Sequence, residues 1–204
     1  LQLLDAAGTE IDQWTTDGTT HRMDAILTAG AEYTLHEVSA PDGYCIAADQ
    51  KFTVNADGSL TNVKLTNLST KVQISKTTIT GDTELEGAKL EVRDLSGNTL
   101  DSWTSGKETH MITAKLTAGQ TYVLHETAAP NGYVVSNDIE FTVNADGTVT
   151  KVIMKDDTTK VEISKKAENG LPLSGAKMQL LDKDGKEVDA WTTDGKAHTL
   201  TAKL

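Results

Sequence analysis

An internal repeat of 89 residues constrains the fold of this chain more than any other feature of its sequence. The segment KVQISK at residues 71–76 returns as KVEISK at 160–165, and FTVNADG at 52–58 returns unchanged at 141–147. The spacing falls to 88 residues in the last copy, after a deletion near Gly175. A unit of this length is a small domain and is longer than a solenoid repeat, so we expect domains in tandem.

The repeat divides the chain into one complete unit between two partial ones. Residues 70–158 form the complete repeat, residues 1–69 lack the first strand, and residues 159–204 carry only the N-terminal half of a third repeat. Because the first residue is Leu1 and both outer repeats are broken, we interpret the sequence as an internal piece of a longer protein.

Each repeat is predicted to be all-β. Apolar and polar residues alternate over short runs such as 122–124 and 161–163, and threonine and valine are abundant, as is typical of strands. Pairs of Asp-Gly or Asn-Gly separate the runs and predict turns; their glycines are Gly18, Gly43, Gly58, Gly132, Gly147 and Gly185. We therefore expect an immunoglobulin-like β-sandwich of about seven strands in each complete repeat.

Charge and composition exclude several classes of partner. The formal net charge is −11 and only two of the basic residues are arginines, so nucleic acid is not an expected partner. No apolar run approaches the length of a membrane span, so membrane insertion is not expected. The single cysteine, Cys45, excludes a disulfide within the chain.

Strand alternation predicts three charged side chains on the buried face of the complete repeat. Lys76 follows Val72 and Ile74 at a spacing of two, and side chains at that spacing share a face. Glu126 follows two apolar residues in the same way, and so does Asp156. Since burial of an isolated charge is costly, these groups are expected to find partners or to become neutral.

This combination of groups is suited to forming an amide. A neutral lysine amine is a nucleophile, the Asp156 carboxyl carbon is its target, and Glu126 is placed to shuttle protons. The product would be an isopeptide bond between Lys76 and Asp156, with loss of water. Alternation alone also allows two simpler outcomes: strand ends that lean into solvent, or an ordinary buried ion pair.

The same residues carry a family resemblance. The segment VQISK at 72–76 followed by LEGAK at 85–89 resembles the opening of a collagen-adhesin B-type (CnaB-like, SpaA-type) domain, and so does VEISK at 161–165 followed by LSGAK at 173–177. The segment ETAAPNGY at 126–133 is similar to the Glu-x-x-Ala-Pro-x-Gly-Tyr motif of that family, and EVSAPDGY at 37–44 is a second instance. The resemblance covers essentially the whole chain.

The resemblance implies tandem prealbumin-like sandwiches of a Gram-positive surface adhesin or pilin, each closed by an isopeptide bond between its first and last strands. It assigns the lysine to Lys76 and Lys165, and the assisting glutamate to Glu126 and Glu37. It assigns the acceptor to Asp156 and Asn67; the aspartate acceptor is similar to that of the parent domain of the SpyCatcher–SpyTag pair. Residues 1–69 lack the lysine, and residues 159–204 lack the glutamate and the acceptor, so neither partial repeat can close its own bond.

Other candidate sites have simpler interpretations. Histidines do not form a close cluster with cysteine or acidic residues, so we expect a solvated surface and no metal; they are His21, His36, His110, His125 and His198. The acidic segment at 182–185 is similar to a calcium-binding loop, but Thr193 stands where a bidentate glutamate is needed, so we expect a hairpin turn. Cys45 is interpreted as an incidental thiol. Trp14, Trp103 and Trp191 are interpreted as core or inter-strand packing, in preference to a sugar-binding surface.

These observations favour a structural stalk repeat of a cell-wall-attached, extracellular protein, with neighbouring repeats as its partners and no cofactor. The alternative is a module that binds a host matrix protein or a glycan through a shared exposed patch. An enzyme is a third possibility, but no nucleophile–base pair for repeated turnover stands out, so we expect only a single-turnover, self-catalysed reaction. Because the two partial repeats lack complementary pieces, we also expect that Lys165 of one molecule could reach Glu37 and Asn67 of another.

Overall fold

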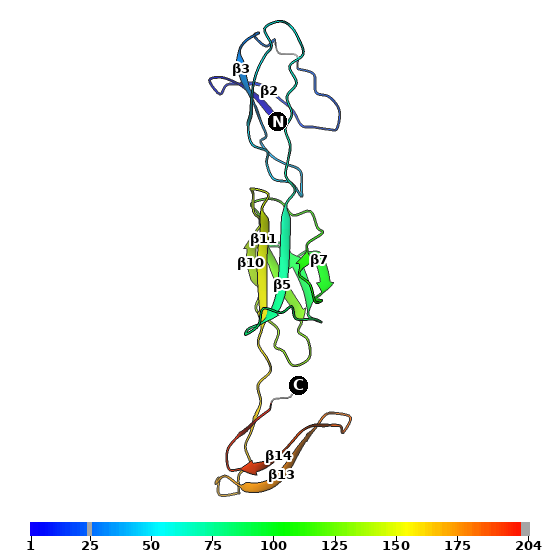
Figure 1. Cartoon of the computed structure of the whole chain (residues 1–204), viewed down its shortest axis with the longest axis vertical. Coiled ribbons are helices and arrows are strands. Elements are labelled where there is room, and N and C mark those ends of the chain that lie inside the picture. The colour runs from blue at the N-terminus through cyan, green and yellow to red at the C-terminus, as the bar shows by residue number, and fades with distance from the viewer. Residues whose placement is uncertain (24–25, 201–204) are drawn as a thin grey trace.

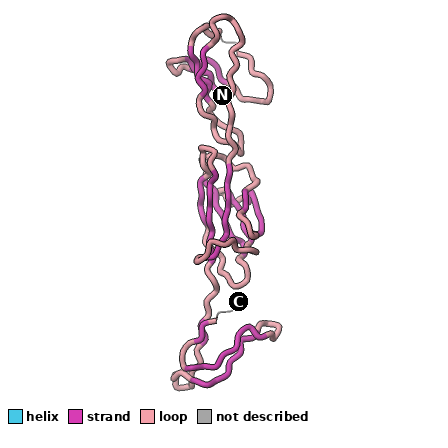
Figure 2. Tube along the Cα trace, in the orientation of Figure 1, coloured by secondary structure: helices cyan, strands magenta, loops and turns pink. Residues whose placement is uncertain are grey.

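The computed structural model describes residues 1–23 and 26–200, and these residues form fifteen strands and no helix. The strands gather into three bodies that follow one another along a single long axis (Figure 1). The first and third repeats lie at opposite ends of the middle repeat (Figure 1). The tube view shows that strands dominate the middle body, whereas loops make up much of the outer two (Figure 2). The prediction of an all-β chain is confirmed.

The middle repeat is a two-sheet sandwich of seven strands. One sheet has the order β10-β9-β6-β7 and the other has the order β11-β5-β8. The strands are β5 (Lys71–Thr78), β6 (Lys89–Arg93), β7 (Thr99–Thr104), β8 (His110–Met111), β9 (Thr121–Ala128), β10 (Ile139–Thr142) and β11 (Val149–Asp156). Both the sandwich and its expected number of strands are confirmed for this repeat.

The first and last strands of the middle repeat, β5 and β11, pair in parallel along their whole length. Val72 and Ile74 of β5 and Val152 and Met154 of β11 point into the sandwich, and β11 has a strict alternation of exposed and buried positions. The core between the sheets consists of Val72, Ile74, Ala88, Leu90, Val92, Leu116, Tyr122, Leu124, Phe141, Val143, Val152 and Met154. The two strands at which the chain enters and leaves this repeat therefore lie side by side.

The first repeat forms a single four-stranded sheet of order β2-β1-β3-β4. Its strands are β1 (Gln2–Asp5), β2 (Glu10–Gln13), β3 (Glu32–His36) and β4 (Gln50–Thr53). Residues 60–67, the counterpart of β11, are not a strand. A β-strand needs a hydrogen-bonded neighbour, and the described residues before position 69 include no counterpart of β5.

The third repeat consists of one long hairpin and one short pair of strands. The hairpin joins β13 (Ser174–Leu181) to β14 (Glu187–Asp194), and β12 (Glu162–Ile163) pairs with β15 (His198–Thr199). At the hairpin tip, Asp182 Oδ1 accepts hydrogen bonds from the backbone N–H groups of Asp184 and Lys186, both at 2.9 Å. The expected hairpin turn at 182–185 is thus confirmed.

The predicted Asp-Gly and Asn-Gly turns are present in all three repeats. All six of their glycines adopt a positive φ, which side chains with a Cβ rarely tolerate. Gly147 is the most constrained, because a Cβ added there would lie 2.7 Å from Leu68 Cδ1. Leu68 belongs to the end of the first repeat, so this turn also forms part of the junction between two repeats.

The junction between the first and middle repeats is held by polar contacts. Thr117 Oγ1 donates to Asp42 Oδ1 at 3.0 Å, and the backbone N–H of Thr70 donates to the Gly43 carbonyl at 2.9 Å. Cys45 is buried, and its Sγ lies 3.8 Å from the Asn144 carbonyl of the next repeat. The cysteine interpreted as incidental therefore packs in the junction.

Candidate functional site

Lys76, Glu126 and Asp156 meet in the interior of the middle repeat. They come from three strands, β5, β9 and β11, and each residue is 1% exposed. Lys76 Nζ contacts Asp156 Oδ1 and lies 3.1 Å from Glu126 Oε1. The prediction that all three side chains point inward is confirmed, and the alternative in which they lean into solvent is wrong.

The parallel register explains why the lysine and the aspartate meet. Lys76 pairs with Met154, and Asp156 pairs with Thr78, so Lys76 and Asp156 are offset by two positions on neighbouring strands. Side chains at that offset share one face of the sheet and are within reach when one of them is long. Glu126 comes from the opposite sheet, where β9 pairs with β6 and β10, and it closes the site from across the core.

The electrostatics of the site favour one neutral carboxyl group. Burial raises the pKa of Glu126, and the neighbouring Asp156 charge adds to the rise. A backbone hydrogen bond from Ser136 and the Lys76 charge act in the opposite direction on that pKa. One cation beside two carboxyl groups would leave a net negative charge in the core, so a protonated Glu126 balances the site.

The hydrogen bonds of the site are incomplete. Asp156 Oδ2 is buried and accepts no hydrogen bond from any group in the described part of the chain. A buried oxygen without a hydrogen bond destabilises an ion pair that persists. The cost disappears if that oxygen leaves Asp156 when an amide forms. The arrangement therefore places the Lys76 amine beside the Asp156 carboxyl carbon in a water-poor core, and Glu126 is close enough to transfer protons.

Ser136 is a fourth polar residue of the site, and sequence reasoning missed it. Its backbone N–H donates to Glu126 Oε2 at 2.6 Å, and its hydroxyl lies 2.6 Å from Asp156 Oδ1. Ser136 sits in the loop between β9 and β10, where strand alternation carries no information. The sequence contained one signal for this residue. The first repeat has Ala47 at the equivalent position, 89 residues earlier, so the serine accompanies the aspartate acceptor and the alanine accompanies the asparagine acceptor.

The first repeat assembles two of the three groups. Asn67 Nδ2 donates to Glu37 Oε2 at 2.5 Å and to the Cys45 carbonyl at 3.0 Å. The backbone N–H of Ala47 donates to the same Glu37 oxygen at 2.6 Å, as Ser136 does to Glu126 in the middle repeat. Glu37 and Asn67 thus lie next to each other, as expected. Among the described residues no lysine forms a hydrogen bond or ion pair with either of them.

Lys165 lies apart from the other predicted residues. It is exposed in the third repeat, just after the two-residue strand β12. Its backbone carbonyl accepts a hydrogen bond from Leu173 N at 3.0 Å. The third repeat and the first repeat lie at opposite ends of the middle one (Figure 1), so Lys165 does not meet Glu37 and Asn67 within one chain.

The histidines do not form a metal site among the described residues. His36 and His125 pair with Asp49 and Asp138 on the outer face, as alternation predicted. The other three histidines also lie at the surface, with side chains about as exposed as that of His125, and each in addition stacks on a tryptophan with ring centroids 4.2–4.3 Å apart. The stacked pairs are Trp14–His21, Trp103–His110 and Trp191–His198, and they show that these tryptophans serve local packing.

No helix among the described residues is long and apolar enough to cross a membrane.

Comparison with known families identifies the fold. The SpaA prealbumin-like fold domain matches residues 1–69 and again residues 70–158. The chain therefore belongs to the SpaA prealbumin-like domain family, as its motifs indicated. No curated protein matches it.

Several solved structures are similar to the chain. The Bacillus anthracis TIE protein is 24% identical, with a TM-score of 0.50, and the match covers 83% of this chain and 34% of that one. This chain thus spans about a third of the length of the TIE protein chain, and the likeness shows a shared fold. The shaft pilin SpaA from Lactobacillus rhamnosus GG is 18% identical over 78% of this chain and 69% of its own, with a TM-score of 0.37. BcpA, the major pilin subunit of Bacillus cereus, is 15% identical over 59% of this chain and 40% of its own, with a TM-score of 0.40.

Proposed function

We propose that this chain is part of the stalk of a Gram-positive surface adhesin or pilin, and that a Lys76–Asp156 isopeptide bond closes its middle repeat. The observation that carries the proposal is the buried contact of Lys76 with Asp156 and Glu126 on paired first and last strands. Membership of the SpaA prealbumin-like family supports the structural role. The solved pilins named above suggest an extracellular location at the cell wall, with neighbouring repeats or subunits as partners.

The bond would form by condensation of the two buried side chains. Glu126 gives its proton to Asp156 Oδ2 and takes one from the Lys76 ammonium group 3.1 Å away, which leaves a neutral amine and a neutral acid. Nζ then attacks Cγ, Glu126 gives its proton to the Oδ2 hydroxyl and takes one from the nitrogen, and Oδ2 leaves as water. Ammonium plus carboxylate thereby become one amide and one water, and Glu126 ends as it began. The reaction occurs once per molecule, so the chain is not an enzyme in the ordinary sense.

Burial holds Lys76 and Asp156 close together and also provides a driving force for bond formation. Before reaction, a cation and its partners occupy a site where desolvation is expensive. After reaction, the lysine and aspartate charges are gone and the core holds a neutral amide. The bond also closes a loop of about 80 residues, which would stabilise the fold by about 4.5 kcal/mol in the chain-entropy treatment used for disulfides.

The position of the bond suits a load-bearing element. The chain enters the middle repeat at Lys71 on β5 and leaves it after Asp156 on β11, and the two strands run in the same direction. Tension would pass along β5 to Lys76, cross the bond and leave at once through Asp156. Residues 77–155 would carry no load, so the rest of the sandwich would stay folded under force.

Single-molecule pulling on the full chain tests this role. We expect the middle repeat of the wild type to release none of residues 77–155, even at forces that extend the outer repeats. Lys76→Ala should release that segment, which adds roughly 250 Å of extended chain. Release of the whole middle repeat in the wild type would contradict the load-bearing proposal.

A further inference from the structure

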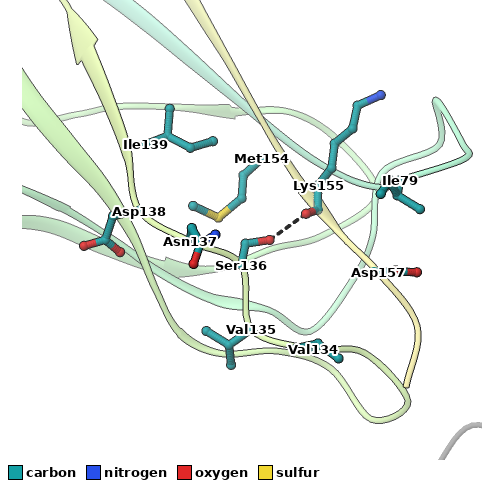
Figure 3. Close-up of a pocket in the computed structure, with 10 residues that line it drawn as sticks. All are labelled: Ile79, Val134, Val135, Ser136, Asn137, Asp138, Ile139, Met154, Lys155 and Asp157. Atoms are coloured by element: carbon teal, nitrogen blue, oxygen red, sulfur yellow. Dashed lines mark hydrogen bonds between the residues drawn. The ribbon is translucent and has the colours of Figure 1, made fainter. Parts of the chain in front are cut away.

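The hydroxyl group of Ser136 sits against the reacting atoms of the proposed bond. Ser136 Oγ lies 2.6 Å from Asp156 Oδ1, 2.6 Å from the Lys155 carbonyl oxygen and 3.4 Å from Lys76 Nζ. Figure 3 shows the serine side chain turned toward β11, with its hydrogen bond to Lys155 drawn. Ser136 is therefore placed beside the carboxyl group that the lysine would attack.

The hydroxyl has one proton and two equally distant acceptors. A serine hydroxyl can donate to the Lys155 carbonyl or to Asp156 Oδ1, and it changes between them by rotation about its Cβ–Oγ bond. The oxygen atom does not have to move. The donor can therefore follow negative charge as that charge appears on Oδ1, at little reorganisation cost.

Comparison of the two acceptors explains why only one repeat has this serine. In the first repeat the acceptor is Asn67, whose own amide group donates to Glu37 and to the Cys45 carbonyl and so fixes the side-chain orientation. The residue beside it is Ala47, which has no hydroxyl. A carboxylate such as Asp156 has no donor of its own, so its orientation needs a donor from elsewhere.

We infer that Ser136 is a further catalytic residue of bond formation, one that orients Asp156 and donates to Oδ1 as the tetrahedral intermediate forms. This inference rests on the proposed isopeptide function. When Nζ bonds to Cγ, the electron pair of the C=O bond moves onto Oδ1, and the Ser136 hydroxyl turns from Lys155 to that oxygen. When the C–Oδ2 bond breaks and water leaves, the C=Oδ1 bond reforms and Ser136 remains hydrogen-bonded to the amide oxygen.

The test is the rate of bond closure in newly made full-length chains. Cell-free synthesis is stopped with a translation inhibitor, samples are denatured at intervals, and the fraction that has lost one water is measured by intact mass. Ser136→Val removes the hydroxyl, and Ser136→Thr keeps it in a side chain of the same shape. A hollow of about 350 Å³, lined by Ser136 and its neighbours, gives room for the added methyl group (Figure 3).

We expect Ser136→Val to slow closure roughly 10²-fold, as is typical for loss of a donor to a developing oxyanion, and Ser136→Thr to close near the wild-type rate. In the Asp156→Asn background closure releases ammonia in place of water, and the loss of ammonia is measured. Ser136→Val should slow closure less there, because an asparagine orients itself through its own amide donors, as Asn67 does beside Ala47. Closure by Ser136→Val at the wild-type rate would overturn the inference, and so would equal slowing by valine and threonine.

A second measurement distinguishes a catalytic role of Ser136 from a purely structural one. In the Lys76→Ala background no bond can form, so the effect of Ser136→Val on the unfolding midpoint reports folding alone. We expect a small change there; a collapse of the fold would overturn the inference by explaining the slow closure. If the wild type itself never loses water, the proposed isopeptide function fails, and that outcome differs from every result specific to Ser136.

Discussion

The first and middle repeats carry similar residues in their last segments, but only the middle repeat forms a strand there. Residues 149–156 make the eight-residue strand β11, whereas residues 60–67 make none, although both show the same alternation of exposure. The difference lies in the neighbour: β11 pairs along its length with β5, and the first repeat has no such strand among the described residues. The last strand of this fold is therefore formed by pairing with the first and not by its own sequence.

The same comparison extends to the buried groups. Glu37 and Asn67 are held together by hydrogen bonds in the first repeat, but the site is more open and has no cation. In the middle repeat Lys76 completes the set, and all three residues are 1% exposed. The strand that carries Lys76, β5, thus supplies two things that the first repeat lacks: a partner strand for the last segment and the lysine of the site.

The largest expected effect comes from Lys76→Ala, which removes the reactant from the complete repeat. The variant should lose the proposed cross-link and leave two carboxyl groups buried without a cation, at a cost of about 5 kcal/mol or more. For a domain of this size the unfolding midpoint should fall by roughly 20–40 °C, which calorimetry would measure.

Lys165→Ala is the matched control. Lys165 is the repeat counterpart of Lys76 but is exposed, so its removal should change the free energy of unfolding by less than about 0.5 kcal/mol. Equal destabilisation by the two variants would contradict the difference drawn between the complete and the partial repeat.

A second, somewhat smaller effect is expected for Glu126→Gln. Lys76 and Asp156 should remain as an ion pair without a group that exchanges protons, so the repeat should lose the cross-link contribution of about 4.5 kcal/mol but keep its charge pair. Chemical denaturation would give the loss, and intact mass would show that no water has left.

The matched variant is Glu37→Gln in the first repeat. It should leave the loss of water in the middle repeat unchanged and cost about 1–2 kcal/mol of local stability, because it weakens the hydrogen bonds from Ala47 and Asn67. Hydrogen exchange would locate that loss in residues 1–69. A Glu126→Gln chain that still loses water would exclude the assigned proton shuttle.

A third effect concerns pH. Burial raises the pKa of Glu126 in the folded state, so the folded repeat binds a proton more tightly than the unfolded chain does. The stabilisation that Glu126 contributes is fully present at a pH below its pKa in the unfolded chain. It is lost as the pH rises through the higher pKa of the folded repeat. In Lys76→Ala, where the opposing lysine is gone, the middle repeat should become more stable as the pH falls toward 5.

Unfolding of Lys76→Ala by denaturant at a series of pH values measures this trend. The double variant Lys76→Ala/Glu126→Gln is its control, because it removes Glu126 and leaves Asp156 as the other buried carboxyl group, so the trend should become clearly weaker. A trend that survives undiminished in the double variant would mean that another group is responsible.

The smallest expected effect is at the junction. Gly58 and Gly147 occupy equivalent turns with positive φ, but only Gly147 faces Leu68 of the preceding repeat. Alanine at either position should cost about 1 kcal/mol from the backbone conformation. Gly147→Ala should in addition displace Leu68 and broaden the angular distribution between repeats, which small-angle X-ray scattering would detect. An unchanged profile for Gly147→Ala would show that Leu68 does not fix the junction.

Sequence reasoning succeeded where periodicity applies. The alternation of β5, β9 and β11 was enough to place Lys76, Glu126 and Asp156 on buried faces, because side chains in a strand alternate with a period of two. It did not find Ser136, which lies in a loop without periodicity. It also could not show that residues 60–67 fail to form a strand, since that outcome depends on a partner distant in the sequence.

The histidines show the same limit. Alternation placed His36 and His125 on the outer face, but it could not show that His21, His110 and His198 stack on tryptophans several residues away. Trp103 and Trp191 lie in β7 and β14, Trp14 directly follows β2, and each histidine lies beyond the next turn. The path of a loop is not encoded in a periodic pattern. Comparison of the repeats was the available signal, because the tryptophan and the histidine are seven residues apart in all three.

The central claim is a covalent bond between Lys76 and Asp156, and the mass of the denatured intact chain tests it most directly. The wild type should be lighter than its sequence by one water, and fragmentation should place the loss on a peptide that joins Lys76 to Asp156. Lys76→Ala should have its full calculated mass. A wild type at full mass would contradict the account and leave the three residues as a buried ion pair.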